Sequence, residues 1–184
     1  MTLPVYVYGS PVLRKIAVDI TKDFPGLSTF ISNMFDTMYN SDGIGLAAPQ
    51  VGQSIRLFVI DGTPLEEDDP QLKDFKRIFI NAKIVERTGE EWPFTEGCLS
   101  IPNVREEVYR PESIRIQYYD EQWQFHDETY NGIAARIIQH EYDHLEGLLF
   151  IDKIPALRRK LLNGRLTAIT RGKVDVSYKI KIPR

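Results

Sequence analysis

The chain has 184 residues, of which 42% are hydrophobic and 27% charged, and its formal net charge is −3 at pH 7. These values are typical of a globular protein with its own core, and we expect a single domain over residues 1–184. The slightly acidic charge excludes a broadly basic surface for DNA or membranes, and the single cysteine excludes an internal disulfide bond.

The first ten residues show no targeting sequence. They lack a charged region followed by an apolar run, so no secretory signal peptide is expected. No stretch approaches about 18 apolar residues, so no membrane-spanning helix is expected either. With its lone cysteine, the sequence favours the reducing environment of the cytoplasm.

The first third of the chain predicts one helix and one buried strand. Residues 6–14 predict extended chain broken by a Gly-Ser-Pro turn. Apolar side chains recur at three- and four-residue spacing over residues 27–40, which predicts a helix with Ser28 as its N-cap. The apolar run at 55–60 predicts a strand. The segment 63–73, which contains four successive acidic residues, predicts an exposed loop.

The middle of the chain predicts antiparallel strands. Residues 77–87 are expected to form one strand, and three further segments to form a meander with a hairpin tip at Asp120-Glu121. These three segments are residues 104–109, 113–119 and 122–129.

The last third predicts two helices and a strand. Residues 131–146 have a helical pattern that Gly147 ends, and residues 155–170 predict a basic helix interrupted at Asn163-Gly164. Alternating apolar residues over 174–182 predict a final strand. The expected fold class is therefore α+β, with mostly antiparallel strands around a central helix and flanking N- and C-terminal helices.

The central helix carries an H-E-x-x-H motif within residues 139–144 (QHEYDH). His140 and His144 are four residues apart, so a helix places both imidazoles on one face, where they can bind one metal ion. Glu141 is then placed to act on a metal-bound water. A catalytic site of this kind usually has a third protein ligand and an open position.

The sequence offers two candidates for the third ligand. The position six residues after His144, where one class of zinc peptidase has a histidine, holds Phe150, and no glutamate follows Glu146. Asp152 is a weak candidate. Cys98 is the stronger one, because a thiolate is a good ligand for borderline divalent ions, although a lone cysteine can also be a small buried hydrophobic residue.

Three motifs, in this order, resemble those of the peptide deformylases. They are residues 43–50 (GIGLAAPQ), residues 96–100 (EGCLS) and residues 139–144 (QHEYDH). Residues 9–14 (GSPVLR) are also similar to the start of that family, and the resemblance extends from about Tyr8 to Ile154. The H-E-x-x-H motif alone is a weak signal, whereas the three motifs together are highly specific.

The resemblance implies a hydrolase that removes the N-formyl group from the N-terminal formylmethionine of newly made polypeptides and releases formate. It implies one divalent metal ion held by Cys98, His140 and His144, with Fe²⁺ as the ion in the cell. Zn²⁺, Ni²⁺ and Co²⁺ also suit this ligand set. A metal-bound water is the expected nucleophile, and Glu141 is expected to take its proton and deliver it to the leaving amine.

The same resemblance implies further site residues. The Gln50 side-chain amide and the Leu99 backbone N–H are expected to stabilise the oxyanion, although Gln50 taken alone would be a surface amide. The glycine loop at 43–45 is expected to hydrogen-bond an extended peptide, although tight packing in a turn also explains its glycines. The expected substrate contacts are Gly43, Ile44, Gly45, Glu96, Gly97, Arg105, Ile133, Arg136 and Ile137.

Some of these residues have a simpler explanation. Ile137 is equally suited to core packing, and His126, which lies in a strand pattern, is expected to be structural or at the surface. Glu96 is expected to pair with Arg110 and so steady the turn that holds Cys98.

Partners and alternative classes follow from the same features. Expected partners are nascent formylated peptides and the ribosome near its exit tunnel, whereas DNA and membranes are not expected. The basic residues between 158 and 171 could contact ribosomal RNA or form a solvated helix face. Two other classes stay open: a zinc endopeptidase with Asp152 as third ligand, and a non-catalytic binding module stabilised by a metal.

Overall fold

The computed structural model describes residues 1–183 and contains two sheets. In the larger sheet every neighbouring pair of strands is antiparallel, and the spatial order is β2 (Gly45–Ala47), β3 (Leu57–Asp61), β4 (Lys76–Cys98), β5 (Ile101–Tyr119) and β6 (Phe125–Asn131). The smaller sheet pairs β1 (Val5–Tyr6) with β7 (Ile180–Lys181) in parallel.

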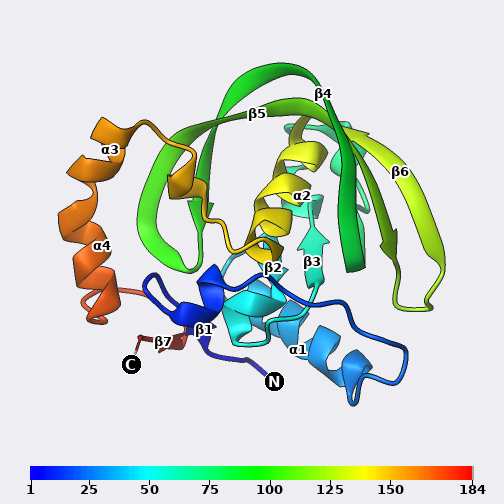
Figure 1. Cartoon of the computed structure of the whole chain (residues 1–184), viewed down its shortest axis with the longest axis horizontal. Helices are drawn as coiled ribbons and strands as arrows, with labels where there is room; N and C mark the ends of the chain where they lie inside the picture. The colour runs from blue at the N-terminus through cyan, green and yellow to red at the C-terminus, as the bar shows by residue number, and fades with distance from the viewer. Residues whose placement is uncertain (184) are drawn as a thin grey trace.

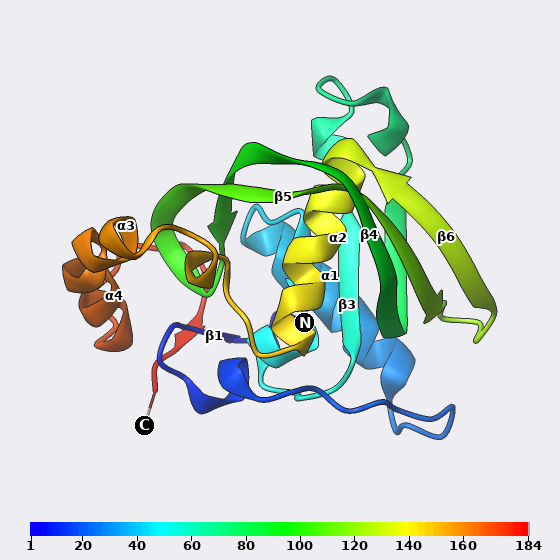
Figure 2. The ribbon, with the colours of Figure 1, turned by 45° about the horizontal axis from the view of Figure 1, so that its top comes forward.

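The helix α2 (Gly132–Leu145) lies in the hollow beneath the arch that β4 and β5 form (Figures 1 and 2). Its buried apolar side chains include Ala135, Ile138 and Leu145, which belong to one core cluster with Phe58 and Phe79 of the sheet. The helix is therefore held by the sheet on one side, while its other side is left to build the site described below.

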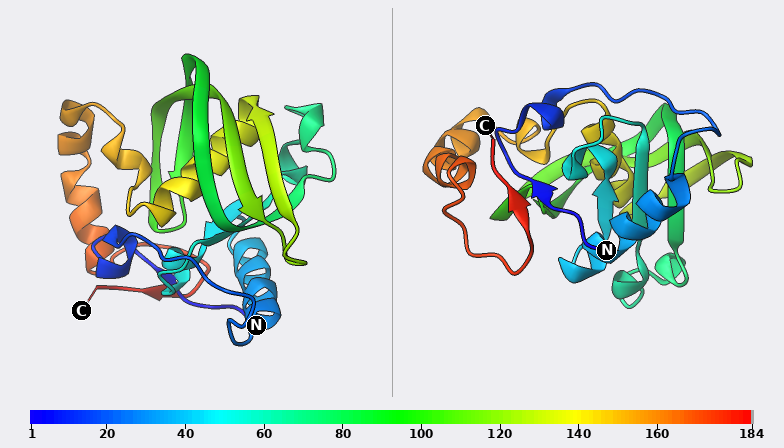
Figure 3. Two further views of the ribbon diagram at one scale, coloured as in Figure 1. Left: turned by 45° about the vertical axis from the view of Figure 1, so that its right-hand side comes forward. Right: turned by 90° about the horizontal axis from the view of Figure 1, so that it is seen from below.

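The sheet separates α2 from the helix α1 (Leu27–Asn40). Along β3, Phe58 and Ile60 pack with the α2 cluster, whereas Leu57 and Val59 pack with the cluster that contains α1. This alternation is expected for a central strand, because successive side chains point to opposite faces. In the right-hand view of Figure 3, from below, α1 (blue) lies in front of the strands and α2 (yellow) is largely hidden behind them.

Two short helices, α3 (Ala156–Leu161) and α4 (Asn163–Thr170), pack beside the first half of β5. Leu162, Leu166 and Ile169 form a third core cluster there with Val104 and Val108. Short 3₁₀ helices complete the fold at Pro11–Arg14, Ala48–Val51, Thr63–Leu65, Pro70–Leu72 and Phe150–Asp152.

The hairpin of β4 and β5 is long and bent. Its register shifts at four places, of which one lies between Gly97 and Cys98 at the closed end of the hairpin. Register shifts of this kind bend a strand and change the direction of its side chains. The hairpin thus curves around α2 and ends with Cys98 beside that helix.

The predicted α+β class is confirmed, and α1 has its predicted bounds. The predicted N-cap was wrong: Gly26 precedes the helix, and the Ser28 hydroxyl donates instead to Glu121. The predicted basic helix is divided at Leu162 into α3 and α4.

The strands differ more from their predicted bounds. The segments 104–109 and 113–119 are one strand, because Pro111 lies opposite Glu91 next to a register shift and does not interrupt the ladder. Only Ile180–Lys181 of the predicted strand 174–182 lie in a ladder, although its alternating burial is present. The acidic loop is anchored by Leu72, which is fully buried.

Within the part of the chain that the structure describes, no helix is both long and apolar enough to cross a membrane.

Candidate metal centre and active site

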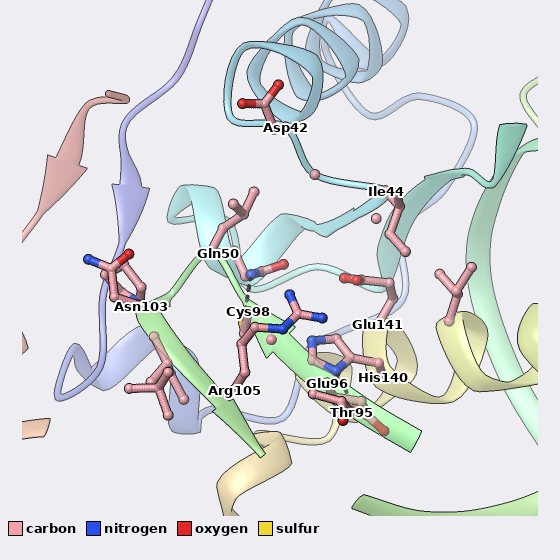
Figure 4. Close-up of a pocket in the computed structure, with 18 of the residues that line it drawn as sticks. Asp42, Ile44, Gln50, Thr95, Glu96, Cys98, Asn103, Arg105, His140 and Glu141 are labelled. Carbon is pink, nitrogen blue, oxygen red and sulfur yellow. Dashed lines mark hydrogen bonds and ion pairs between the residues drawn. The ribbon is translucent and has the colours of Figure 1, made fainter. Parts of the chain in front are cut away.

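Three potential metal ligands meet between the closed end of the β4–β5 hairpin and α2. Figure 4 shows two of them, Cys98 and His140. Cys98 is the last residue of β4, and His140 and His144 lie one turn apart on α2. One ligand atom from each residue can be chosen so that all three lie within 4.8 Å of one another, and Cys98 Sγ is 3.5 Å from His144 Nε2. The structure therefore brings together the three residues that the sequence analysis named.

Glu96 fixes the orientation of His140. Its Oε1 lies 2.7 Å from His140 Nδ1. The other ring nitrogen of His140 is therefore available to bind a metal ion. The same carboxylate accepts hydrogen bonds from Arg110 and Arg136. Burial alone would raise the pKa of Glu96, but His140 and Arg110 outweigh it and hold that pKa far below its usual range. The expected pair of Glu96 with Arg110 is thus confirmed.

Asp143 extends this network, and nothing predicted from the sequence singled it out. It is 4% exposed, and its Oδ2 accepts a hydrogen bond of 2.7 Å from Arg110 Nη1. A signal was available in the sequence, because Asp143 follows His140 by three residues and so lies on the same side of the helix.

The pKa values of the two histidines in the cluster shift in opposite directions. Burial would lower the pKa of His140, but hydrogen bonds to Cys98 and Glu96 raise it well above its ordinary value. Burial lowers the pKa of His144, and the nearby His140 lowers it further. One thiol and two imidazoles are donors that borderline divalent ions prefer. The residues present therefore fit a divalent metal ion.

Glu141 faces the cavity beside this cluster (Figure 4). It is 5% exposed, and its Oε2 has no hydrogen-bond partner among the described residues. Burial raises the pKa of Glu141 to about 7, and this effect outweighs the lowering by His140, which Glu96 partly offsets. A Cβ atom added to Gly45 would lie 2.5 Å from Glu141 Oε1, so this close approach requires glycine.

Gln50 is buried rather than a surface amide, with 2% of its surface exposed. The Ala47 N–H donates to its Oε1 at 2.9 Å, which directs the amide nitrogen toward the cluster. That nitrogen lies 3.4 Å from Cys98 Sγ and 3.2 Å from Ser100 Oγ. Leu99 follows Cys98 in the two-residue turn of the hairpin and also lines the cavity.

A cavity of about 520 Å³ contains these groups. Most of the predicted substrate contacts line it, and the structure thereby brings together Gly43, Ile44, Gly45, Glu96, Gly97, Arg105, Arg136 and Ile137. Ile133 is not among the lining residues and instead packs, partly buried, against the α2 core cluster. Arg105 is exposed at the rim, where its Nη1 would lie 3.2 Å from a Cβ added to Gly97.

Two other predicted residues lie away from the cluster. Asp152 binds Arg14, with hydrogen bonds of 2.6 and 3.1 Å, and accepts from the Leu149 N–H, so it is not part of the metal-ligand group. His126 lies on β6 and hydrogen-bonds Asp120 at 2.7 Å, in agreement with a structural or surface role.

One wall of the cavity was not predicted from the sequence. Val176 and Tyr178, from the segment before β7, line it together with Asn103. Burial raises the pKa of Tyr178 to about 12, and the nearby Cys98 adds to the effect, so its hydroxyl remains a donor at neutral pH. No local motif marks these two residues, because only the folded chain brings them beside Cys98.

Most of the chain matches one protein family. The family model described as polypeptide deformylase matches residues 2–160. A peptide deformylase from Christiangramia forsetii is 53% identical over 190 aligned positions, which cover 100% of this chain and 97% of that relative.

Solved structures agree with this comparison. A peptide deformylase from Plasmodium falciparum is 39% identical, has a TM-score of 0.81, and is matched over 91% of this chain and 95% of its own. A peptide deformylase from Legionella pneumophila is 36% identical, also has a TM-score of 0.81, and is matched over 94% of this chain and 98% of its own.

Proposed function

The chain belongs to the polypeptide deformylase family, and on that basis we propose that it removes the N-formyl group from the N-terminal formylmethionine of nascent polypeptides in the cytoplasm. The reaction is hydrolysis of a linear amide, and its products are formate and a free amino terminus. The whole of residues 1–184 is proposed to act as one catalytic domain.

Cys98, His140 and His144 are the proposed ligands of one divalent ion, with Fe²⁺ as the ion expected in the cell. Bound there, the ion would acidify a water molecule and polarise the formyl oxygen. Two features support the assignment: the compact set of ligand atoms, and the contact of Glu96 with His140 Nδ1, which leaves the other ring nitrogen available.

Glu141 is the proposed general base and acid. Its carboxylate takes a proton from the attacking water and delivers it to the leaving amine nitrogen. The support is geometric, because Oε2 is buried in the cavity without a partner among the described residues, beside the three ligands. A carboxylate that no protein group occupies retains its lone pairs for water.

Gln50 and Leu99 are the proposed oxyanion donors, through the side-chain amide and the backbone N–H respectively. The contact of Gln50 Oε1 with the Ala47 N–H supports this role, since it holds the amide nitrogen near the cluster before substrate arrives. Loss of one such donor typically lowers the rate about 10²–10³-fold.

The peptide is proposed to bind along β2. This strand is at the edge of the five-stranded sheet, paired with β3 on one side, and its first residue is Gly45. An edge strand offers backbone groups to an extended peptide. The methionine side chain would then enter the part of the cavity lined by Ile44, Arg136 and Ile137.

Contact with the ribosome remains a prediction. Of the basic residues that suggested it, Arg158 pairs with Glu106 and Arg159 with Asp152, and these pairs favour a structural role for both side chains.

The observation that carries the proposal is the partnerless Glu141 carboxylate in the same cavity as the Cys-His-His cluster. The test is release of formate from formyl-Met-Ala-Ser by anaerobically prepared, Fe²⁺-loaded protein. Glu141→Gln should lower kcat by about 10²–10⁴-fold while the bound metal is retained. The matched control is Glu146→Gln, which follows α2 and pairs with Arg56; it should keep its activity.

Absence of formate from a folded, metal-loaded wild type would overturn the proposed function. Equal rates for wild type and Glu141→Gln would show that Glu141 is not the general base, and would leave the proposed deformylase activity supported.

A further inference from the structure

The segment between α4 and β7 is extended and has two different faces. Over residues 174–181, Val174, Val176, Tyr178 and Ile180 are partly buried, whereas Asp175, Ser177 and Lys179 are exposed. Val174 and Ile180, near the two ends, pack against the core cluster that also contains Phe150. Val176 and Tyr178, between them, line the cavity.

Hydrogen bonds to two other parts of the chain hold this segment in place. Asn103 Nδ2 donates to the Asp175 carbonyl at 3.1 Å, and the Tyr178 hydroxyl donates to the Leu99 carbonyl at 2.9 Å. The N–H groups of Val5 and Val7 donate to the carbonyls of Lys179 and Lys181, at 2.9 and 3.0 Å. The wall is therefore fixed both to the hairpin that carries Cys98 and to the N-terminal strand.

This wall lies on the side of the cavity away from α2. Figure 4 shows Asn103, which binds the segment, on the far side of Cys98 from Ile44 and His140. The cavity therefore has an α2 side, with Ile137 and Arg136, and a second side formed by Val176 and Tyr178, whose hydroxyl donates to the Leu99 carbonyl. Its volume of about 520 Å³ is within the range of roughly 300–1,000 Å³ that holds a ligand of several groups.

In an extended substrate peptide, the side chains of two successive residues would face these two sides of the cavity. Side chains of neighbouring residues in an extended chain point in opposite directions. If the methionine side chain points toward α2, the side chain of the next residue points toward the opposite wall. That wall offers the apolar surface of a valine and an aromatic ring, beside Asn103, whose amide nitrogen already donates to the Asp175 carbonyl.

We propose that Val176 and Tyr178 are specificity-determining residues that contact the side chain of the residue after formylmethionine and favour an apolar one. The inference rests on the proposed function. Tyr178 is in addition a positioning residue, because its hydroxyl holds the backbone of Leu99, the proposed oxyanion donor.

The test compares formyl-Met-Leu-Ser with formyl-Met-Ser-Ser as substrates of the full-length, Fe²⁺-loaded enzyme. Wild type should have the higher kcat/KM for the leucine peptide. Val176→Ala should reduce the ratio of the two values about threefold to tenfold, mainly through a higher KM for the leucine peptide, because it removes apolar contact.

Val174→Ala is the matched control, since it shortens the same type of side chain in the same segment but at a position that packs on the core. It should keep the wild-type ratio. Tyr178→Phe retains the ring and removes the hydroxyl, so it should lower kcat for both peptides several-fold and keep both the ratio and the KM values.

The possible outcomes separate the two proposals. A ratio near one in wild type, or the same ratio in wild type and Val176→Ala, would overturn the role of the wall while deformylation stood. An unchanged kcat in Tyr178→Phe would overturn the positioning role. No formate from either peptide with wild type would overturn the proposed function, and the inference with it.

Discussion

Glu96 Oε1 and His140 Nδ1 are 2.7 Å apart, and this contact joins the β4–β5 hairpin to α2 at the metal cluster. Both side chains are largely buried, with 4% of Glu96 and 11% of His140 exposed. The contact holds the His140 ring in one orientation before any ion binds, and the two arginines on the same carboxylate hold Glu96 itself.

Glu96→Gln should weaken both the metal site and the fold. Loss of the carboxylate charge leaves Arg136 without a buried counter-charge and removes one of the two counter-charges of Arg110. This should lower the free energy of unfolding by about 3 kcal/mol. Metal affinity should fall about 10- to 100-fold, since outer partners of metal-bound histidines have effects of this size. Equilibrium unfolding and metal titration measure the two effects.

Glu106→Gln is the control for this change, because Glu106 is also buried but pairs with the exposed side chain of Arg158, away from the cluster. It should leave metal affinity unchanged. Equal metal affinities in wild type and Glu96→Gln would show that the contact with His140 does not orient a ligand.

Cys98→Ser and Asp152→Asn should separate the two candidates for the third ligand. Cys98→Ser should lose most of its metal after dialysis against a weak chelator, because a hydroxyl is a poor replacement for a thiolate. Asp152→Asn should keep one ion per chain, since Asp152 is occupied by Arg14. Metal analysis of the dialysed proteins is the measurement, and the reverse pattern would favour the peptidase alternative.

Gly45→Ala should reduce activity by at least tenfold. The added Cβ would lie 2.5 Å from Glu141 Oε1, so either the carboxylate or β2 has to move. Gly164→Ala is the control, because no atom lies within 4 Å of a Cβ at this helical position; it should keep full activity and gain about 0.5–1 kcal/mol of stability. If Gly45→Ala kept the wild-type kcat, the close approach of Gly45 to Glu141 would not be required for activity.

The pair of Asp152 with Arg14 should make stability depend on pH. Burial would raise the pKa of Asp152, but hydrogen bonds from Arg14 and the Leu149 N–H outweigh it, so the pKa lies below its ordinary value of 3.8. A lowered folded-state pKa adds stability above the unfolded-state pKa, and this stability is lost as pH falls through the folded-state value.

Asp152→Asn should therefore be less stable than wild type at pH 7, by about 1 kcal/mol. The difference should shrink as pH falls below about 4. Urea unfolding at a series of pH values measures it, and a difference that stayed constant down to pH 2 would assign the effect to something other than this carboxylate.

Much of the site could be predicted from the sequence because its chemistry depends on short spacings. The four-residue spacing of His140 and His144 fixes their common helix face, and the lone Cys98 lies in a recognisable turn. The bounds of α1 could be predicted because its apolar spacing ends at Tyr39, one residue before the last helical residue, Asn40.

Features that depend on distant parts of the chain could not be predicted in the same way. Asp143 was not singled out because its partner Arg110 belongs to another element. Ile133 was expected in the cavity from its helix face, but the core around α2 takes its side chain. The strand expected over 174–182 has its alternating burial, but only two of its residues lie beside a strand with which they can pair.

The pairing of β1 with β7 has a consequence for the order in which the cavity is assembled. Val5 pairs with Ile180, so this small sheet cannot close until synthesis has passed Lys181. The hairpin and α2, which carry the three proposed ligands, are by then already made. Contacts between such distant segments form late, because the loop between them must be closed first. A chain whose synthesis has not yet passed Lys181 therefore carries all three proposed ligands but lacks the pairing that fixes the wall of Val176 and Tyr178.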